Sequence, residues 1–137
     1  MPGFVLKDAS VKINSVVLSD HARSVTVNYS AEVQDATCMN PDGTKSKVSG
    51  LKDWTLDIEF AQDFATGSVD ATLFPLVGGA AVPIEIKPTS AATSPTNPAY
   101  AGNGIVQSYP PLGGAVGALA TTTVRIEGTG LLTRATA

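Results

Sequence analysis

The chain has 137 residues, the length of one ordinary domain, and its single cysteine excludes an intrachain disulfide and a four-cysteine zinc site. Charged residues make up 15% of the chain, against about 25% in a typical soluble domain. Nine basic and 12 acidic residues give a net charge of −3, which argues against a domain that neutralises many phosphates of a nucleic acid.

The charges are unevenly distributed along the chain. Residues 1–70 hold 10 of the acidic and 6 of the basic residues, and no charged residue occurs from Pro88 to Val124. This uncharged stretch is rich in Pro, Gly, Asn and Ser and has no run of about 18 apolar residues, so it does not predict a transmembrane helix. Met1–Lys7 lacks the basic region and apolar core of a signal peptide, so we expect synthesis and retention in a cytoplasm.

A hydrophobic period of two dominates the first half of the chain and predicts strands. Val11–Ile13 is a weak strand that is expected to turn at Asn14–Ser15 into Val16–Leu18. Ser24–Val33 has apolar or small residues at odd positions, and Asp53–Phe60 has apolar residues at even positions. Both longer segments are therefore predicted to turn one face to a core and a polar face away from it.

A long loop is predicted between these two strands. Pro41 presets φ and Gly43 tolerates a positive φ, so Asn40–Gly43 predicts a turn. The whole connection, Met39–Gly50, is longer than a hairpin needs.

One short helix is predicted after Ser68, which is expected to cap it. Asp70 falls in the first turn, where its charge opposes the helix dipole. Val69 and Leu73 share one face of this helix, and Pro75 is expected to end or kink it.

The remaining predicted strands are Val82–Ile86, Ile105–Tyr109 and Thr122–Ile126. The pattern predicts a mainly β single domain over residues 1–137, a β-sandwich or partly open barrel of about six to eight strands with one short helix. Because the carboxy-terminal half has little charge to protect sheet edges, we expect the barrel to be completed partly by neighbouring copies.

We predict no catalytic residue, metal or cofactor. Ser19–His21 has three triad residue types side by side, but adjacent residues on a turn point apart, so we interpret them as a capping Ser or Asp and a surface His. His21 is the only histidine. Gly113–Gly117 has neither the Lys-Ser/Thr end of a P-loop nor the G-x-G-x-x-G spacing of a dinucleotide-binding loop. We interpret it as a flexible or closely packed loop. Cys38 is interpreted as a small apolar side chain.

The densest acidic region coincides with one predicted strand. Asp53, Asp57 and Glu59 share its polar face, with Asp57 and Glu59 about 6–7 Å apart. Three interpretations stay open: a solvated strand face, a carboxylate pair or hard-cation site, and an acidic wall of a water-filled space. Trp54 and Phe60 are predicted core residues, with a sugar-stacking platform as the alternative.

Seven segments spread over most of the chain have the residues of one known family. They are Ser24–Tyr29, Gln34–Thr37, Leu51–Leu56, Gln62–Phe64, Val69–Leu76, Pro88–Ser90 and Asn97–Tyr100. In this order they resemble the small tail tube, or major tail, proteins of long-tailed bacteriophages, particularly those of actinobacterial hosts. The likeness consists of structural residues and includes no reactive motif.

The resemblance implies a virion protein of the phage tail, assembled in the host cytoplasm and without enzymatic activity. Members of the family fold as a β-sandwich with a flanking helix and form hexameric rings that stack into a hollow tube for DNA ejection. Each subunit contributes strands to a barrel around an acidic or neutral lumen, and long loops and arms link successive rings. The implied partners are a tape measure protein in the lumen, terminator and tail-tip proteins at the ends, and DNA that passes without specific binding.

Two groups of residues are candidates for these roles. An acidic strand face toward the lumen would repel phosphates and let DNA slide, and a long loop would reach a neighbouring subunit. The candidate lumen residues are Asp53, Asp57 and Glu59, or the polar face with Asn28 and Glu32. The candidate inter-subunit residues in Met39–Gly50 are Met39, Asn40, Asp42, Lys45 and Lys47.

Alternatives from other classes stay open at this point. A capsid decoration or head-completion protein would also be small, β-rich and non-catalytic. A carbohydrate-binding β-sandwich would use Trp54, Tyr100 and Tyr109 as its platform. An enzyme would depend on the acidic pair alone.

Overall fold

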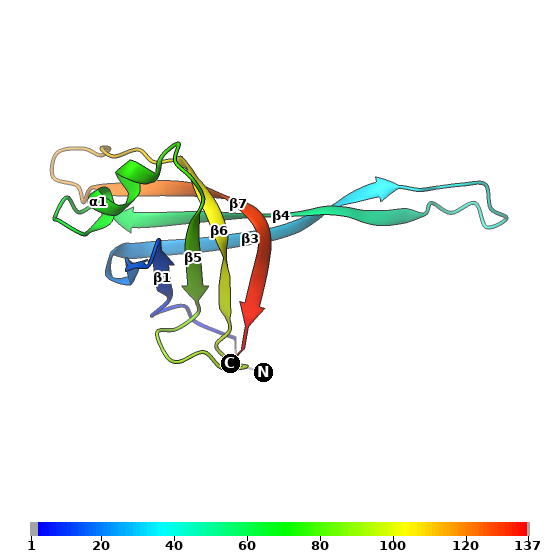
Figure 1. Ribbon diagram of the computed structural model, residues 1–137, viewed down its shortest axis with the longest axis horizontal. Helices are drawn as coiled ribbons and strands as arrows, with labels where there is room; N and C mark the ends of the chain where they lie inside the picture. Colours follow the sequence, from blue (N-terminus) through cyan, green and yellow to red (C-terminus); the bar gives the residue numbers. More distant parts are fainter. Residues whose placement is uncertain (1–2, 137) are drawn as a thin grey trace.

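The structure is a computed structural model, and it describes residues 3–136 (Figure 1). Met1 and Pro2, part of the segment considered for a signal peptide, lie outside the described residues. The described elements in chain order are β1 (Ser10–Ile13), β2 (Val16–Val17), the 3₁₀ turn η1 (Ser19–His21), β3 (Ala22–Asp35), β4 (Lys47–Ala61), α1 (Val69–Leu73), the 3₁₀ turn η2 (Phe74–Leu76), β5 (Val82–Lys87), β6 (Ala99–Ser108) and β7 (Thr121–Ala135).

The seven strands form one sheet with the order β2-β1-β5-β6-β7-β4-β3, in which all neighbours are antiparallel. Figure 1 shows β3, β4 and the first part of β7 running across the view, while β5, β6 and the end of β7 run down it. β7 belongs to both parts, because Thr121–Glu127 pairs with β4 and Arg125–Ala135 pairs with β6. The predicted mainly β fold with six to eight strands and one short helix is confirmed, with the strands in one open sheet. Completion of a barrel by neighbouring copies stays a prediction.

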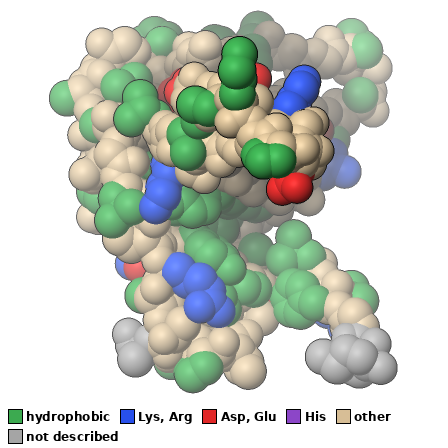
Figure 2. Space-filling model, turned by 90° about the vertical axis from the view of Figure 1, so that its right-hand side faces the viewer, with side chains coloured by type: hydrophobic (Ala, Val, Ile, Leu, Met, Phe, Trp, Pro, Cys, Tyr) green, Lys and Arg blue, Asp and Glu red, His purple; other side chains and the backbone are tan. Residues whose placement is uncertain are grey.

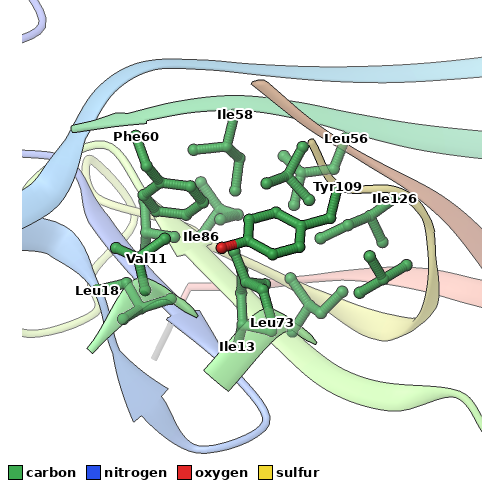
Figure 3. Close-up of a cluster of buried hydrophobic side chains, with 14 of the residues drawn as sticks. Val11, Ile13, Leu18, Leu56, Ile58, Phe60, Leu73, Ile86, Tyr109 and Ile126 are labelled. Atoms are coloured by element: carbon green, nitrogen blue, oxygen red, sulfur yellow. The ribbon is translucent and has the colours of Figure 1, made fainter. Parts of the chain in front are cut away.

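The core lies on the concave side of the bent sheet. Alternate residues of β4, from Trp54 to Phe60, are buried there, as predicted. Figure 3 shows Leu56, Ile58 and Phe60 facing Ile13, Leu18 and Leu73, with the Tyr109 ring between them. The buried hydrophobic cluster consists of Val11, Ile13, Leu18, Trp54, Leu56, Ile58, Phe60, Val69, Leu73, Ile84, Ile86, Val106, Tyr109, Val124 and Ile126.

Two glycines make room for the Trp54 indole against the sheet. A Cβ at Gly128 would lie 2.2 Å from Trp54 Cε2, and one at Gly102 would lie 2.8 Å from Trp54 Cζ2. Glycine in a strand often marks such a close approach. The same glycines weaken the strand pattern, which explains why β6 begins earlier and β7 ends later than predicted.

The helix forms where it was predicted, but Ser68 does not cap it through its side chain. Its hydroxyl is used instead in a contact with His21 and Asp63, described below. Val69 and Leu73 are both buried, as predicted, and η2 follows α1 directly with Pro75 in its first turn. In the part of the chain that the structure describes, no helix has the length and apolar character needed to cross a membrane.

β3 and β4 continue far beyond the sheet as a two-stranded hairpin, drawn in cyan and green at the right of Figure 1. β7 pairs with β4 only from Thr55 onward, so the hairpin has no third strand before that residue. Residues 31–53, which we call the arm, are all exposed. The predicted turn Asn40–Gly43 lies at its tip, where Gly43 has φ +67° and its N–H donates to Asn40 O over 3.3 Å.

Candidate assembly surfaces

The side of β3, β4 and β7 that faces away from the core is polar. Its residues alternate with the core residues and lie directly opposite one another across the strands: Asp57 stands between Thr26 and Arg125. We call this surface the polar face, and it consists of Ser24, Thr26, Asn28, Asp53, Thr55, Asp57, Glu59, Thr123, Arg125 and Glu127.

Four of the five candidate lumen residues lie together on the polar face. Asn28 is opposite Thr55, so the two alternative faces of the sequence analysis are one surface. Glu32 lies farther out, in the arm beside a register shift, where its Cβ is 3.3 Å from the position of a Cβ added to Gly50.

Arg125 was missed as a site residue, because its partners lie on two strands. Its Nη1 is 3.2 Å from both carboxylate oxygens of Asp57, and its Nε is 2.9 Å from Glu127 Oε2. The polar face therefore has four acidic side chains and one basic side chain, and that cation is held between two carboxylates. Among residues 3–136, no group of three or more His, Cys, Asp or Glu side chains could hold a metal ion.

The tip of the arm is ordered by its own hydrogen bonds. Asn40 Nδ2 donates to Thr44 O over 2.9 Å, and Thr37 Oγ1 accepts from the Ser46 N–H over 2.9 Å. Thr37 also donates to Asp35 through its N–H and its hydroxyl, which lowers the pKa of that carboxyl. All five candidate inter-subunit residues lie in this exposed segment, although β4 already begins at Lys47.

Cys38 is exposed at the same tip. Its neighbour Met39 is fully exposed as well. An alternation of apolar and polar residues could not predict the positions of Cys38 and Met39, because neither face of the arm is buried.

His21 is not an unpartnered surface histidine. Its Nε2 is 2.9 Å from Asp63 Oδ2, and Ser68 Oγ donates to the same oxygen over 2.8 Å. The Ala65 N–H, Ser68 and His21 together lower the pKa of Asp63. The Ser68 hydroxyl also lies 3.3 Å from His21 Nε2, so the three side chains form one hydrogen-bonded cluster. The cluster joins η1 to the loop before α1.

Tyr109 makes a second connection beside α1. Its Oη donates to Asp70 Oδ1 over 2.7 Å and accepts from Gln62 Nε2 over 2.9 Å. Burial is the main reason that its pKa is raised to about 12. Because Trp54 and Tyr109 are both buried, the aromatic platform of the carbohydrate-binding alternative does not exist.

An apolar groove of about 460 Å³ opens below the base of the arm. Val25, Val27 and Tyr29 of β3 form one wall. Figure 2, which looks at the molecule from the arm side, shows hydrophobic side chains around a hollow there. We call this feature the groove; the other lining residues are Leu6, Ala9, Ile86, Lys87, Pro88, Tyr100, Leu132, Thr133 and Arg134.

Comparison with solved structures places this bent sheet among chains of tailed particles. A chain in the tail of an empty gene transfer agent particle, solved with C6 symmetry, matches with a TM-score of 0.75 and 14% identity over 96% of this chain and 98% of that chain. This chain shares its fold. A chain in the virion of the native gene transfer agent matches with a TM-score of 0.74, the same identity and the same coverage.

A third match is partial. The Dit protein of SPP1, described as a paradigm of the hub adsorption apparatus in phages that infect Gram-positive bacteria, matches with a TM-score of 0.51 and 17% identity. The match covers 90% of this chain and 50% of that chain. No family model and no curated protein matches the sequence.

Proposed function

We propose that this protein is the structural subunit of a phage-type tail tube. Six copies form a ring, the rings stack, and DNA leaves the capsid through the lumen. The observation that carries the proposal is the shared fold over 96% of the chain with a chain of a C6-symmetric tail. A tape measure protein would occupy the lumen during assembly, and terminator and tip proteins would close the ends.

The polar face is the surface that we assign to the lumen. It is a broad strand surface with an excess of acidic side chains, which repels phosphates and lets DNA slide. Proteins that hold DNA instead present several cations to its phosphates. Here the one cation, Arg125, already contacts Asp57 and Glu127, and the three side chains together have a net negative charge.

The sheet edges support assembly into a closed ring. β3 is an edge strand of 14 residues, and its outer edge is unpaired among the described residues. An exposed edge of this length favours pairing with another chain, and ring closure would remove it. We further propose that the arm, with Met39–Gly50, reaches a neighbouring subunit.

Electron microscopy of the purified protein tests the proposal. We expect stacked six-fold rings that form a hollow tube. The partial likeness to Dit favours a second candidate, a hub, which would form single rings and no long tubes. Trimers, or binding to capsids only, would instead indicate a decoration protein.

The assignment of the lumen predicts how charge reversal affects DNA release. Replacing Asp57 and Glu59 by Lys should leave tubes assembling but slow DNA ejection at low salt, because cations then face the phosphates. Glu59→Lys combined with Asp53→Lys is the sharper variant, since it leaves the Asp57–Arg125 ion pair intact. Ejection kinetics from particles that contain each variant are the measurement.

Asp20→Lys combined with Glu85→Lys is the matched control, because it makes the same charge change on η1 and β5, outside the polar face. We expect it to leave ejection unchanged. Normal ejection of the Asp53→Lys, Glu59→Lys variant at low salt would contradict the lumen assignment.

A further inference from the structure

The groove is an apolar surface that the chain itself leaves open. α1 and the core cover the inner side of β4, but the β3 residues Val25, Val27 and Tyr29 are only half-buried or exposed. Among residues 3–136, no acidic residue lines the groove, and the two charged lining residues, Lys87 and Arg134, are cations. Its volume lies in the range of sites that hold a ligand or an inserted segment. Apolar patches of this kind usually mark an interaction site.

A second exposed apolar feature lies at the opposite end of the molecule. The loop between β6 and β7, residues 109–120, exposes Leu112 by 80% and Leu119 by 63%, and Val116 fully. Figure 1 shows this loop, in orange, beside α1 at the end away from the arm. The loop and the groove of one molecule therefore cannot meet.

The loop is held in place at both of its ends by the end of β4 and the start of β7. Gln62 Nε2 donates to Pro111 O over 2.6 Å, and Thr122 Oγ1 donates to Pro110 O over 2.7 Å. At the other end, the Gln62 N–H donates to Ala120 O over 2.9 Å. A loop anchored in this way loses less conformational freedom on binding than a free one.

The composition of the loop also suits an apolar site. It lies within the uncharged stretch from Pro88 to Val124, so burying it removes no charge from water. The described residues that line the groove likewise include no acidic side chain that would be left unpaired. The loop and the groove are therefore both apolar, and they lie at opposite ends of one molecule.

We infer that the groove of one copy receives the β6–β7 loop of a second copy, stacked head to tail. This inference rests on the proposed function, because it assigns the contact between successive rings. A head-to-tail contact whose rotation does not close into a ring repeats along an axis and so produces a filament. It places Val116 of one ring against Val27 and Tyr29 of the next.

Two complementary variants test this contact. Val116→Glu disables the loop and leaves the groove intact, while Val27→Glu disables the groove and leaves the loop intact. Each variant alone should form no structure longer than one ring. When rings of the one variant are mixed with an equal amount of rings of the other, they should form pairs of rings and nothing longer. The intact groove of a Val116→Glu ring receives the intact loop of a Val27→Glu ring, and the loop and groove left at the ends of the pair are both disabled. Light scattering and electron microscopy measure the lengths.

Cysteine crosslinking tests the same contact without disturbing the half-buried Val27. In chains that carry Cys38→Ser, a chain with Val116→Cys is mixed with a chain with Tyr29→Cys and oxidised mildly. Both positions are exposed in one copy, so the fold is preserved. We expect a disulfide between the two chains. The control replaces Tyr29→Cys by Val77→Cys, an exposed position in the segment after η2, and should give none.

The outcomes separate the contact from the tube itself. Tubes of normal length from both glutamate variants, or equal crosslinking of the control pair, would overturn the contact while leaving the tube proposal intact. A specific crosslink between the Val116→Cys and Tyr29→Cys chains, together with a wild-type protein that never forms rings or tubes, would support the contact and remove the proposed function.

Discussion

The two ends of the β3–β4 hairpin have the same backbone pairing and opposite surroundings. At the body end, β7 joins β4 from Thr55 onward, and alternate side chains from Trp54 to Phe60 are buried. At the arm end, residues 31–53 are all exposed. A two-stranded hairpin alone is at best marginally stable in water, so the arm depends on the body for its anchorage.

The difference teaches that the buried core is built on one length of the two strands, while the contact with a neighbouring subunit that we propose falls on the other length. The arm buries no side chain, yet Asn40 and Thr37 keep its tip in one conformation through several hydrogen bonds. Order without burial adds little to the stability of the body. It is useful where a surface must be ready to bind, because it lowers the entropy lost on association. Mutations at the two ends should therefore affect different measurements.

Phe60→Ala should have the largest effect on stability. Phe60 is fully buried in the hydrophobic core, and truncating such a ring costs about 3–5 kcal/mol through lost burial and the cavity left behind. Urea unfolding followed by Trp54 fluorescence measures the change. Phe64→Ala, at an exposed phenylalanine four residues along, should change the free energy of unfolding by about 0.5 kcal/mol or less. Equal effects of the two variants would contradict the core assignment.

Tyr109→Phe should have an intermediate effect at neutral pH. It removes one hydrogen bond to the carboxylate of Asp70 and one from Gln62, at a cost of about 1–3 kcal/mol. Tyr100→Phe is the control, since the Tyr100 hydroxyl makes no hydrogen bond to another of the described residues, 3–136. A similar loss in both variants would mean that the Asp70 and Gln62 contacts contribute nothing.

Tyr109 also predicts how the free energy of unfolding changes at alkaline pH. The pKa of Tyr109 is about 12 in the folded protein and about 10 in an unfolded chain, so the folded state holds this proton more tightly. Its contribution to stability is therefore complete below about pH 10 and is lost as the pH rises toward 12. The free energy of unfolding of wild type should fall more steeply over this range than that of Tyr109→Phe.

The core end of the hairpin could be predicted from sequence because burial leaves a period of two. Ser24–Val33 and Asp53–Phe60 were predicted as strands, and Trp54 and Phe60 were correctly assigned to the core. The arm could not be given its full length, because strands with two exposed faces have no such pattern. The predicted strand therefore began at Asp53, whereas β4 begins at Lys47.

The polar contacts show a second limit of sequence reasoning. Arg125 meets Asp57 across 68 positions, and His21 meets Asp63 across 42. Such pairs depend on strand register and on the path of loops, which one sequence does not reveal. Ser68 illustrates the consequence: its position predicted a helix cap, but tertiary structure offered its hydroxyl a carboxylate partner instead.

Deletion of Asp42–Lys47 should have a small effect on stability and a large effect on assembly. The six residues are exposed and bury nothing in the core, so the free energy of unfolding should change by about 1 kcal/mol or less. If the arm reaches a neighbouring subunit, the variant should stay folded and fail to form tubes, as seen by electron microscopy. Replacing the six residues by a Gly-Ser segment of equal length keeps the length of the arm but removes these side chains. This variant therefore shows whether assembly needs the length of the arm or its side-chain contacts. Tubes of normal length from the deletion variant would contradict the role of the arm, and a large loss of stability would contradict the division between the two ends of the hairpin.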